Sequence, residues 1–269
     1  MMTITNNGTH VEIHGQRGGG NTPPIIFIHG LGLNKGMWAH QIQPLTPTHQ
    51  VICYDLYGHG ASPPPPETPS LRMFSQQLAD LMEALNIAHA SVMGFSLGGM
   101  ITRRFAMDFP DKVTSIGILH SPHKRSKAAH DHIQSRVYQA QKDGADATIE
   151  DALIRWFTDD FRKAMPPTLD QIRSWVKAND KAIYPAIYQV LVDGVDELIA
   201  PQPPISCPAL VMTGDEDFGN NPDMSAAIAA EIPQSECVIL NGLRHMAMME
   251  APERFNTVLI SFLKKHHYK

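Results

Sequence analysis

The chain has 269 residues, with 22 lysines and arginines against 27 aspartates and glutamates, which gives a formal charge of −5. Because a nucleic-acid binder usually presents a basic face, this balance argues against nucleic acid as a main partner. Hydrophobic residues make up 43% of the chain, which excludes disorder for most of it and favours one compact domain with an insertion.

The number of cysteines and the length of the apolar runs indicate the cellular compartment in which the protein is expected. The chain has three cysteines, Cys53, Cys207 and Cys237. This number is small and odd, which argues against a disulfide framework. The N-terminal stretch Met1–Gly8 is polar, without the apolar core of a signal peptide. The sequence also lacks a run of about 18 apolar residues. We therefore expect a cytoplasmic protein that does not cross a membrane.

Strand and helix patterns alternate in two parts of the chain. Short apolar runs are typical of strands buried on both faces, and apolar residues three or four apart are typical of helices. In chain order the first part predicts strands 25–28 and 51–54, helix 71–85, strand 90–93, helix 96–109 and strand 113–119. The second part predicts strand 209–212, helix 223–231, strand 237–240 and helix 252–265. Such alternation predicts an α/β fold with parallel strands and crossover helices.

Residues 122–200 break this alternation. They contain no strand-like run, and their apolar residues recur at helical spacing around Ile133, Leu153, Ile172 and Ile187. We expect a helical cap here, inserted between an N-terminal core part, residues 1–121, and a C-terminal core part, residues 201–269.

The sequence Gly94-Phe95-Ser96-Leu97-Gly98 lies between a predicted strand and a predicted helix. Gly-x-Ser-x-Gly in this context is typical of a nucleophile elbow, a turn so tight that its serine is held in an unfavourable backbone conformation. Side chains at positions 94 and 98 would collide with their neighbours, which explains both glycines. Ser96 is therefore the candidate nucleophile, at a helix N-terminus that favours negative charge.

A serine needs a base to remove its proton as it attacks. His245 is the best of 14 histidines, since it follows the last predicted strand, at the edge where open α/β sheets bind ligands. An acid that orients this histidine is expected in the loop after strand 209–212. Asp217 is favoured because it lies farther out on the loop, while Asp215 and Glu216 remain alternatives.

Acyl transfer also needs donors for the oxyanion. The small residues of His29-Gly30-Leu31-Gly32 let this loop fold over Ser96 and direct the Leu31 N–H inward. The Leu97 N–H, directly after the nucleophile, is the second expected donor. Removal of one such donor typically lowers the rate by about 10²–10³.

Further residues are candidates for the substrate pocket. Its walls are expected to include aromatic side chains of the insertion, histidines after strand 113–119 and a methionine beside His245: Trp156, Phe157, Trp175, His120, His123 and Met246. Each of the tryptophans and Phe157 could equally pack the cap onto the core. The basic run His123–Lys127 attracts an anionic substrate or forms a solvated cap entrance.

Five motifs in order resemble the α/β-hydrolase superfamily. They are His29–Gly32, Tyr54–Ser62, Gly94–Gly99, Gly214–Asp217 and His245 with Glu250–Glu253. The chain is most similar to small carboxylesterases and 3-oxoadipate enol-lactonase-like serine hydrolases. The resemblance implies a mostly parallel central sheet flanked by helices, a helical cap after the sixth strand, Asp217 as the acid, and neither cofactor nor metal.

The expected activity is hydrolysis of a small-molecule carboxylic ester or lactone through an acyl-enzyme on Ser96. Aspartate-dependent dehalogenase and epoxide hydrolase activities are disfavoured, since the nucleophile position holds serine. The alternatives are a carbon–carbon bond hydrolase of diketones, a cofactor-free haloperoxidase or perhydrolase, and a hydrolase-fold receptor for small molecules. The protein is expected to be a monomer or a homodimer.

Overall fold

A computed structural model describes residues 2–16 and 22–266. Within these residues one sheet has eight strands. Their bounds are β1 Met2–Ile4, β2 His10–His14, β3 Ile25–Ile28, β4 Val51–Tyr54, β5 Ala90–Phe95, β6 Val113–Leu119, β7 Ala209–Gly214 and β8 Ser235–Leu240. Every residue of β3, β4, β5 and β7 is buried, because helices cover both faces of the central strands.

The strand order is β1-β2-β4-β3-β5-β6-β7-β8, and β3 to β8 run parallel. The sequence predicted the six parallel strands and missed β1 and β2, which add an antiparallel edge. Ile28 pairs with Gly94, so the loop after β3 and the turn after β5 leave the sheet side by side. Parallel pairing thus brings the motifs of distant segments to one edge.

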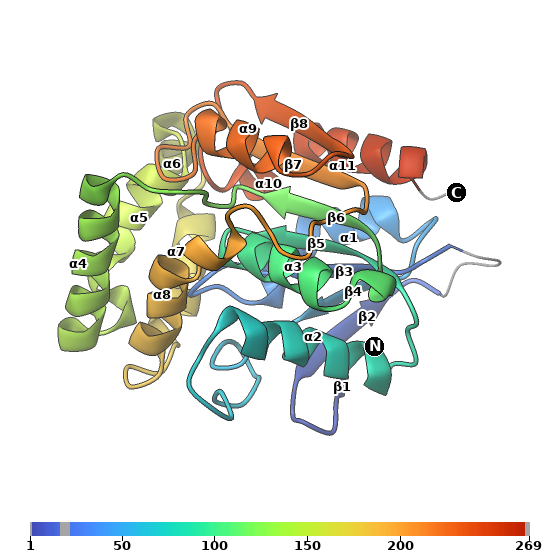
Figure 1. The fold of residues 1–269 in the computed structure, drawn as a ribbon. Helices are drawn as coiled ribbons and strands as arrows, with labels where there is room; N and C mark the ends of the chain where they lie inside the picture. The colour runs from blue at the N-terminus through green and yellow to red at the C-terminus, as the bar shows by residue number, and fades with distance from the viewer. Residues whose placement is uncertain (1, 17–21, 267–269) are drawn as a thin grey trace.

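Helices cover both faces of the sheet (Figure 1). On one face lie α2 Leu71–Ala84, α3 Leu97–Asp108 and α9 Pro222–Ala230, and on the other lie α1 Ala39–Leu45 and α11 Pro252–His266. The short helix α10, Ala247–Glu250, precedes α11. Ser70 caps α2, since its hydroxyl accepts a hydrogen bond from the Met73 N–H. The apolar residues of α2 that follow face the core, which explains its amphipathic sequence.

Between β6 and β7 the chain forms further helices instead of strands. They are α4 Lys127–Asp143, α5 Ile149–Trp156, α6 Asp159–Ala164, α7 Pro166–Lys177 and α8 Tyr184–Asp193, called the inserted helices below. They gather at one end of the molecule, on the left in Figure 1. Their positions agree with the helical spacing of the sequence in this stretch.

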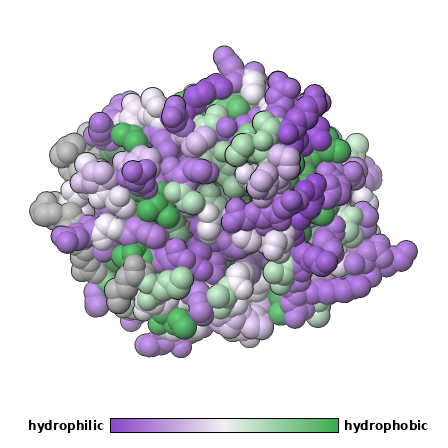
Figure 2. All heavy atoms as spheres, turned by 180° about the vertical axis from the view of Figure 1, so that it is seen from behind, coloured by the Kyte–Doolittle hydropathy of each residue, from purple (hydrophilic) through white to green (hydrophobic). Residues whose placement is uncertain are grey.

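The surface of the described part mixes hydrophilic and hydrophobic residues. On the face opposite to that of Figure 1, hydrophobic residues are scattered between hydrophilic ones (Figure 2). No helix within residues 2–16 and 22–266 has both the length and the apolar character needed to cross a membrane.

Candidate active site

Ser96 occupies a strained turn between β5 and α3. Its backbone angles are φ 55° and ψ −112°, a conformation that residues with side chains rarely adopt. A Cβ atom at Gly94 would lie 2.0 Å from the Gly98 carbonyl oxygen, and one at Gly98 would lie 2.4 Å from the Ile28 carbonyl oxygen. Because these obstacles are backbone atoms, only glycine fits at either position, as the sequence motif predicts.

Two buried histidines hold the loop that follows β3. The Gly32 N–H donates to His59 Nε2 over 2.9 Å, and the Leu56 N–H donates to His29 Nε2 over 3.0 Å. Each histidine therefore accepts a hydrogen bond from a backbone N–H at Nε2, which requires a neutral ring. Burial lowers the pKa of His59 to about 3, with the charge of His29 acting in the same direction, and burial also lowers the pKa of His29. Both rings thus stay neutral and keep this loop in place.

The backbone N–H groups of Leu31 and Leu97 are the expected oxyanion donors. Leu97 is the first residue of α3, where N–H groups have no acceptor within the helix. Among residues 2–16 and 22–266, neither N–H donates a backbone or side-chain hydrogen bond. Two free donors at neighbouring strand ends, beside Ser96, suit an oxygen that becomes negatively charged.

His245 and Asp217 form a direct pair. His245 Nδ1 lies 2.7 Å from Asp217 Oδ2, and both side chains are buried. The two rival acids lie elsewhere: Asp215 Oδ1 accepts the Gly242 N–H, and Glu216 Oε2 lies 3.4 Å from Arg244 Nε. Of the three candidates in the loop, Asp217 is therefore the residue that contacts His245.

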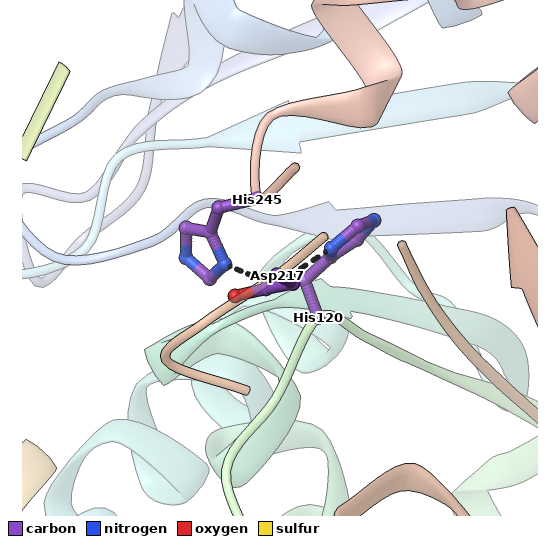
Figure 3. Close-up of side chains that lie close together, drawn as sticks. All are labelled: His120, Asp217 and His245. Carbon is purple, nitrogen blue, oxygen red and sulfur yellow. Dashed lines mark hydrogen bonds and ion pairs between the residues drawn. The ribbon is translucent and has the colours of Figure 1, made fainter. Parts of the chain in front are cut away.

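His120 contacts the same carboxylate from the opposite side (Figure 3). Its Nδ1 lies 3.0 Å from Asp217 Oδ2, and its ring is fully buried. Burial would raise the pKa of the Asp217 carboxyl, but the charge of His245 and the hydrogen bonds from both histidines lower it well below its usual range. Burial also lowers the pKa of His120, against the hydrogen bond and charge of Asp217. His120 is thus a neutral donor to an ionised Asp217.

These three side chains are also of types that bind metals. Their ligand atoms lie within 4.8 Å of one another, as a divalent cation would need. However, the separations of 2.7 Å and 3.0 Å between the Nδ1 atoms and Oδ2 are those of direct hydrogen bonds. The polar atoms that face one another are therefore already satisfied as a hydrogen-bonded network.

A cavity of about 520 Å³ opens above these groups. Ser96, His245 and Asp217 all line it, so the candidate nucleophile and base face the same space. Of the predicted pocket residues, Trp156 and His123 line it as well, and so does Leu31, whose N–H is an expected oxyanion donor. The Trp156 ring centroid lies 6.2 Å from that of His245.

The remaining predicted pocket residues lie away from the cavity wall. Phe157 is fully buried and stacks on Phe161, and Met246 is fully buried next to His245 in the sequence. Trp175 packs against Gly36, and His120 supports Asp217 from behind. None of these four residues is among those that line the cavity, so the cavity gives no support to their predicted pocket role.

The cavity also contains residues that the sequence reasoning did not single out. Among them are Arg136 on α4, Arg155 on α5, and Tyr184 and Tyr188 on α8. Arg136 lies three residues after the buried Ile133, and therefore on the same face of its helix. This spacing could have indicated from the sequence that Arg136 faces inward.

Comparison with known proteins agrees with this geometry. The model of the alpha/beta hydrolase fold family matches residues 23–252. The (E)-2-((N-methylformamido)methylene)succinate hydrolase of Acinetobacter baylyi is 27% identical over 245 residues, 91% of this chain and 92% of its own. The 3-oxoadipate enol-lactonase 2 of the same organism is 26% identical over 249 residues, 92% of this chain and 91% of its own.

A solved structure shares the fold and most of the length. The enol-lactonase from Burkholderia xenovorans LB400 superposes with a TM-score of 0.89 at 27% identity, covering 98% of this chain and 100% of its own. These relatives are hydrolases, which supports hydrolase activity here. With most of its length matched by the family, this chain belongs to the alpha/beta hydrolase fold family.

Proposed function

We propose that this protein is a serine hydrolase that cleaves a carboxylic ester or lactone of a small molecule. The observation that carries the proposal is that Ser96, in a strained turn, lines one cavity with His245, whose Nδ1 lies 2.7 Å from Asp217. The relatives named as enol-lactonases favour the ester and lactone class, because both bonds yield to the same acyl transfer.

In the proposed reaction Ser96 Oγ attacks the substrate carbonyl carbon while its proton passes to His245 Nε2. The carbonyl oxygen becomes an oxyanion that accepts hydrogen bonds from the N–H groups of Leu31 and Leu97. Collapse breaks the bond to the alcohol, which leaves with the proton from His245. Water then attacks the acyl-enzyme, gives a proton to His245, and releases the acid and Ser96.

Asp217 has the role of fixing the proton on His245. A carboxylate that accepts Nδ1–H leaves Nε2 as the acceptor that faces Ser96, and it stabilises the imidazolium during the reaction. The depressed pKa of Asp217 supports this role, since an ionised carboxylate is needed over the whole neutral range.

We also propose that residues 122–200 act as a cap over the site, with Trp156 as a wall near His245. The Met246 N–H donates to the Trp156 carbonyl oxygen over 2.9 Å, which links α5 to the segment beside the catalytic histidine. Side chains of the inserted helices line much of the cavity, so they would select substrates by shape and charge.

The test is covalent labelling with a fluorophosphonate together with a panel of p-nitrophenyl esters of increasing chain length, lactones and diketones. We expect labelling at Ser96 and multiple turnover of an ester or lactone. Ser96→Ala and His245→Ala should each lower kcat by about 10⁴–10⁶, non-additively. Turnover that survives Ser96→Ala, cleavage of the diketones alone, or a stable adduct after a single turnover would each contradict the proposal.

A further inference from the structure

The cavity has a basic side that the proposed acyl transfer does not use. Arg125, in the loop after β6, Arg136 on α4 and Arg155 on α5 all line the cavity with Ser96. All three side chains are only partly exposed. A guanidinium group keeps its charge at neutral pH, so three positive charges face the space in which a substrate would lie.

Arg136 acts electrostatically on both of the other arginines in the cavity wall. Burial lowers the pKa of Arg125 to about 10, and the charge of Arg136 acts in the same direction. Burial likewise lowers the pKa of Arg155, again together with the charge of Arg136. Arg136 is thus within electrostatic range of both other arginines, and its charge repels each of theirs in a partly desolvated site.

No carboxylate of the described chain forms an ion pair with these arginines. Arg125 Nη1 donates to the Leu191 carbonyl oxygen, and the ion pairs within residues 2–16 and 22–266 include none of the three. Asp196 and Asp151 act on Arg125 and Arg155 only from beyond ion-pair distance. On the cavity wall itself, the acids are Asp217, already bound to two histidines, and the exposed Asp223.

Several other arginines of this chain are paired with carboxylates. Arg103 pairs with Glu231 at 3.0 Å, Arg104 with Asp108 at 2.7 Å, and Arg173 with Glu150 at 2.6 Å. The chain also carries more acids than bases, 27 against 22, so unpaired arginines do not follow from a shortage of carboxylates. A cluster of like charges without a partner in a cavity is best explained by a partner that arrives with the ligand.

We propose that Arg125, Arg136 and Arg155 form an anion subsite that binds a carboxylate group of the substrate while Ser96 attacks its ester or lactone carbonyl. The inference rests on the proposed hydrolase function and narrows it to substrates that carry a second, negatively charged end. Guanidinium groups hold a carboxylate through paired, charge-assisted hydrogen bonds, and Tyr188 on the same wall can supply a further donor.

The experiment compares two esters of similar length, mono-p-nitrophenyl glutarate, which ends in a carboxylate, and p-nitrophenyl valerate, which ends in a methyl group. We expect kcat/KM to be about tenfold to a hundredfold higher for the glutarate ester, as one or two charge-assisted hydrogen bonds would give. The ratio of kcat/KM between the two esters should become smaller in 0.5 M salt, because screening at about this concentration reduces the range of electrostatic attraction to a few ångströms.

Arg136→Gln and Arg155→Gln should each reduce this preference at least fivefold, and the double variant should abolish it. Arg173→Gln is the matched control, since Arg173 lies on α7 outside the cavity lining and is paired with Glu150 and Asp170. Its preference should equal that of the wild type. Equal hydrolysis of both esters by the wild type, or a preference that survives the double variant, would overturn the subsite and leave the hydrolase proposal standing.

Calorimetric titration with glutarate separates the two proposals if neither ester is hydrolysed. Binding that is weakened at least tenfold by Arg136→Gln, but not by Arg173→Gln, would support the subsite even though the hydrolase proposal had failed. An absence of binding, or binding that is the same in both variants, would overturn the subsite.

Discussion

The exchange Asp217→Asn separates the role of Asp217 from that of its neighbours in the loop. Oδ2 of Asp217 faces Nδ1 of both His245 and His120, at 2.7 Å and 3.0 Å. Oδ1 accepts the backbone N–H groups of Gly219 and Asn220, at 3.2 Å and 3.0 Å. An asparagine keeps its single oxygen on the two backbone donors, so its NH₂ group must face the two histidines.

That orientation reverses the hydrogen bond to His245. The ring must then accept at Nδ1 and carry its proton on Nε2, where it can no longer remove the proton of Ser96. The loss of a correctly placed base tautomer typically lowers kcat by about 10⁴, which corresponds to about 5.5 kcal/mol of transition-state stabilisation. Asp215→Asn is the matched control, because Asp215 is exposed and its Oδ1 accepts only the Gly242 N–H, a role that an amide oxygen can fill.

The assay is steady-state hydrolysis of an ester found in the substrate panel, with circular dichroism melts to verify that both variants fold. We expect Asp217→Asn to lose about 10⁴ in kcat and Asp215→Asn to stay within about twofold of the wild type. Comparable losses in the two variants, or a greater loss in Asp215→Asn, would refute the assignment of Asp217 as the orienting acid.

Three further changes test the supports of the site. His120→Ala removes one donor from Asp217 and should lower kcat about tenfold, the value of one charge-assisted hydrogen bond, with KM unchanged in the same assay. Gly98→Ala places a Cβ atom 2.4 Å from the Ile28 carbonyl oxygen and should cost about 1–3 kcal/mol in the free energy of unfolding, measured with urea. His59 has a folded pKa of about 3, so below pH 6.5 the unfolded chain binds a proton that the folded chain does not. The wild type should therefore lose up to about 1.4 kcal/mol of stability per pH unit as pH falls from 6 to 4, and His59→Gln should lose less in urea titrations at these pH values.

The sequence predicted the elements whose local pattern and tertiary environment agree. Strands such as Ile25–Ile28 are apolar throughout because both faces are covered, and the strand–turn–helix around Ser96 needs its glycines for reasons that are local to the turn. The edge strands β1 and β2 escaped prediction, since β2 reads His-Val-Glu-Ile-His, which is not an apolar run, and only its Val11 is fully buried. Its pairing with β4 depends on long-range contacts.

The lining of the cavity was predicted less well than the contact between Asp217 and His245. Helical spacing places Phe157 and Trp175 on apolar faces, but it does not say whether such a face meets the cavity or another part of the chain. His120 was expected to contact substrate because it follows β6 at the right edge. Its backbone, at φ 49°, turns the ring beneath Asp217 instead, a direction that no local pattern indicates.

Ser96 and His120 share a strained backbone, with φ of 55° and 49°, at the ends of adjacent strands. The ladder holds both turns, because the Ser96 N–H donates to the Leu119 carbonyl oxygen and the His120 N–H donates to that of Met212. Strain of this kind costs about 1–3 kcal/mol, and glycine relieves it. At an ordinary helical position such as the exposed Ser135, glycine is less stable than alanine by about 0.5–1 kcal/mol. We expect Ser96→Gly to be at least as stable as Ser96→Ala in urea unfolding, while Ser135→Gly is less stable than Ser135→Ala. If the glycine variant were less stable than the alanine variant at Ser96 as well as at Ser135, the turn at Ser96 would store no strain.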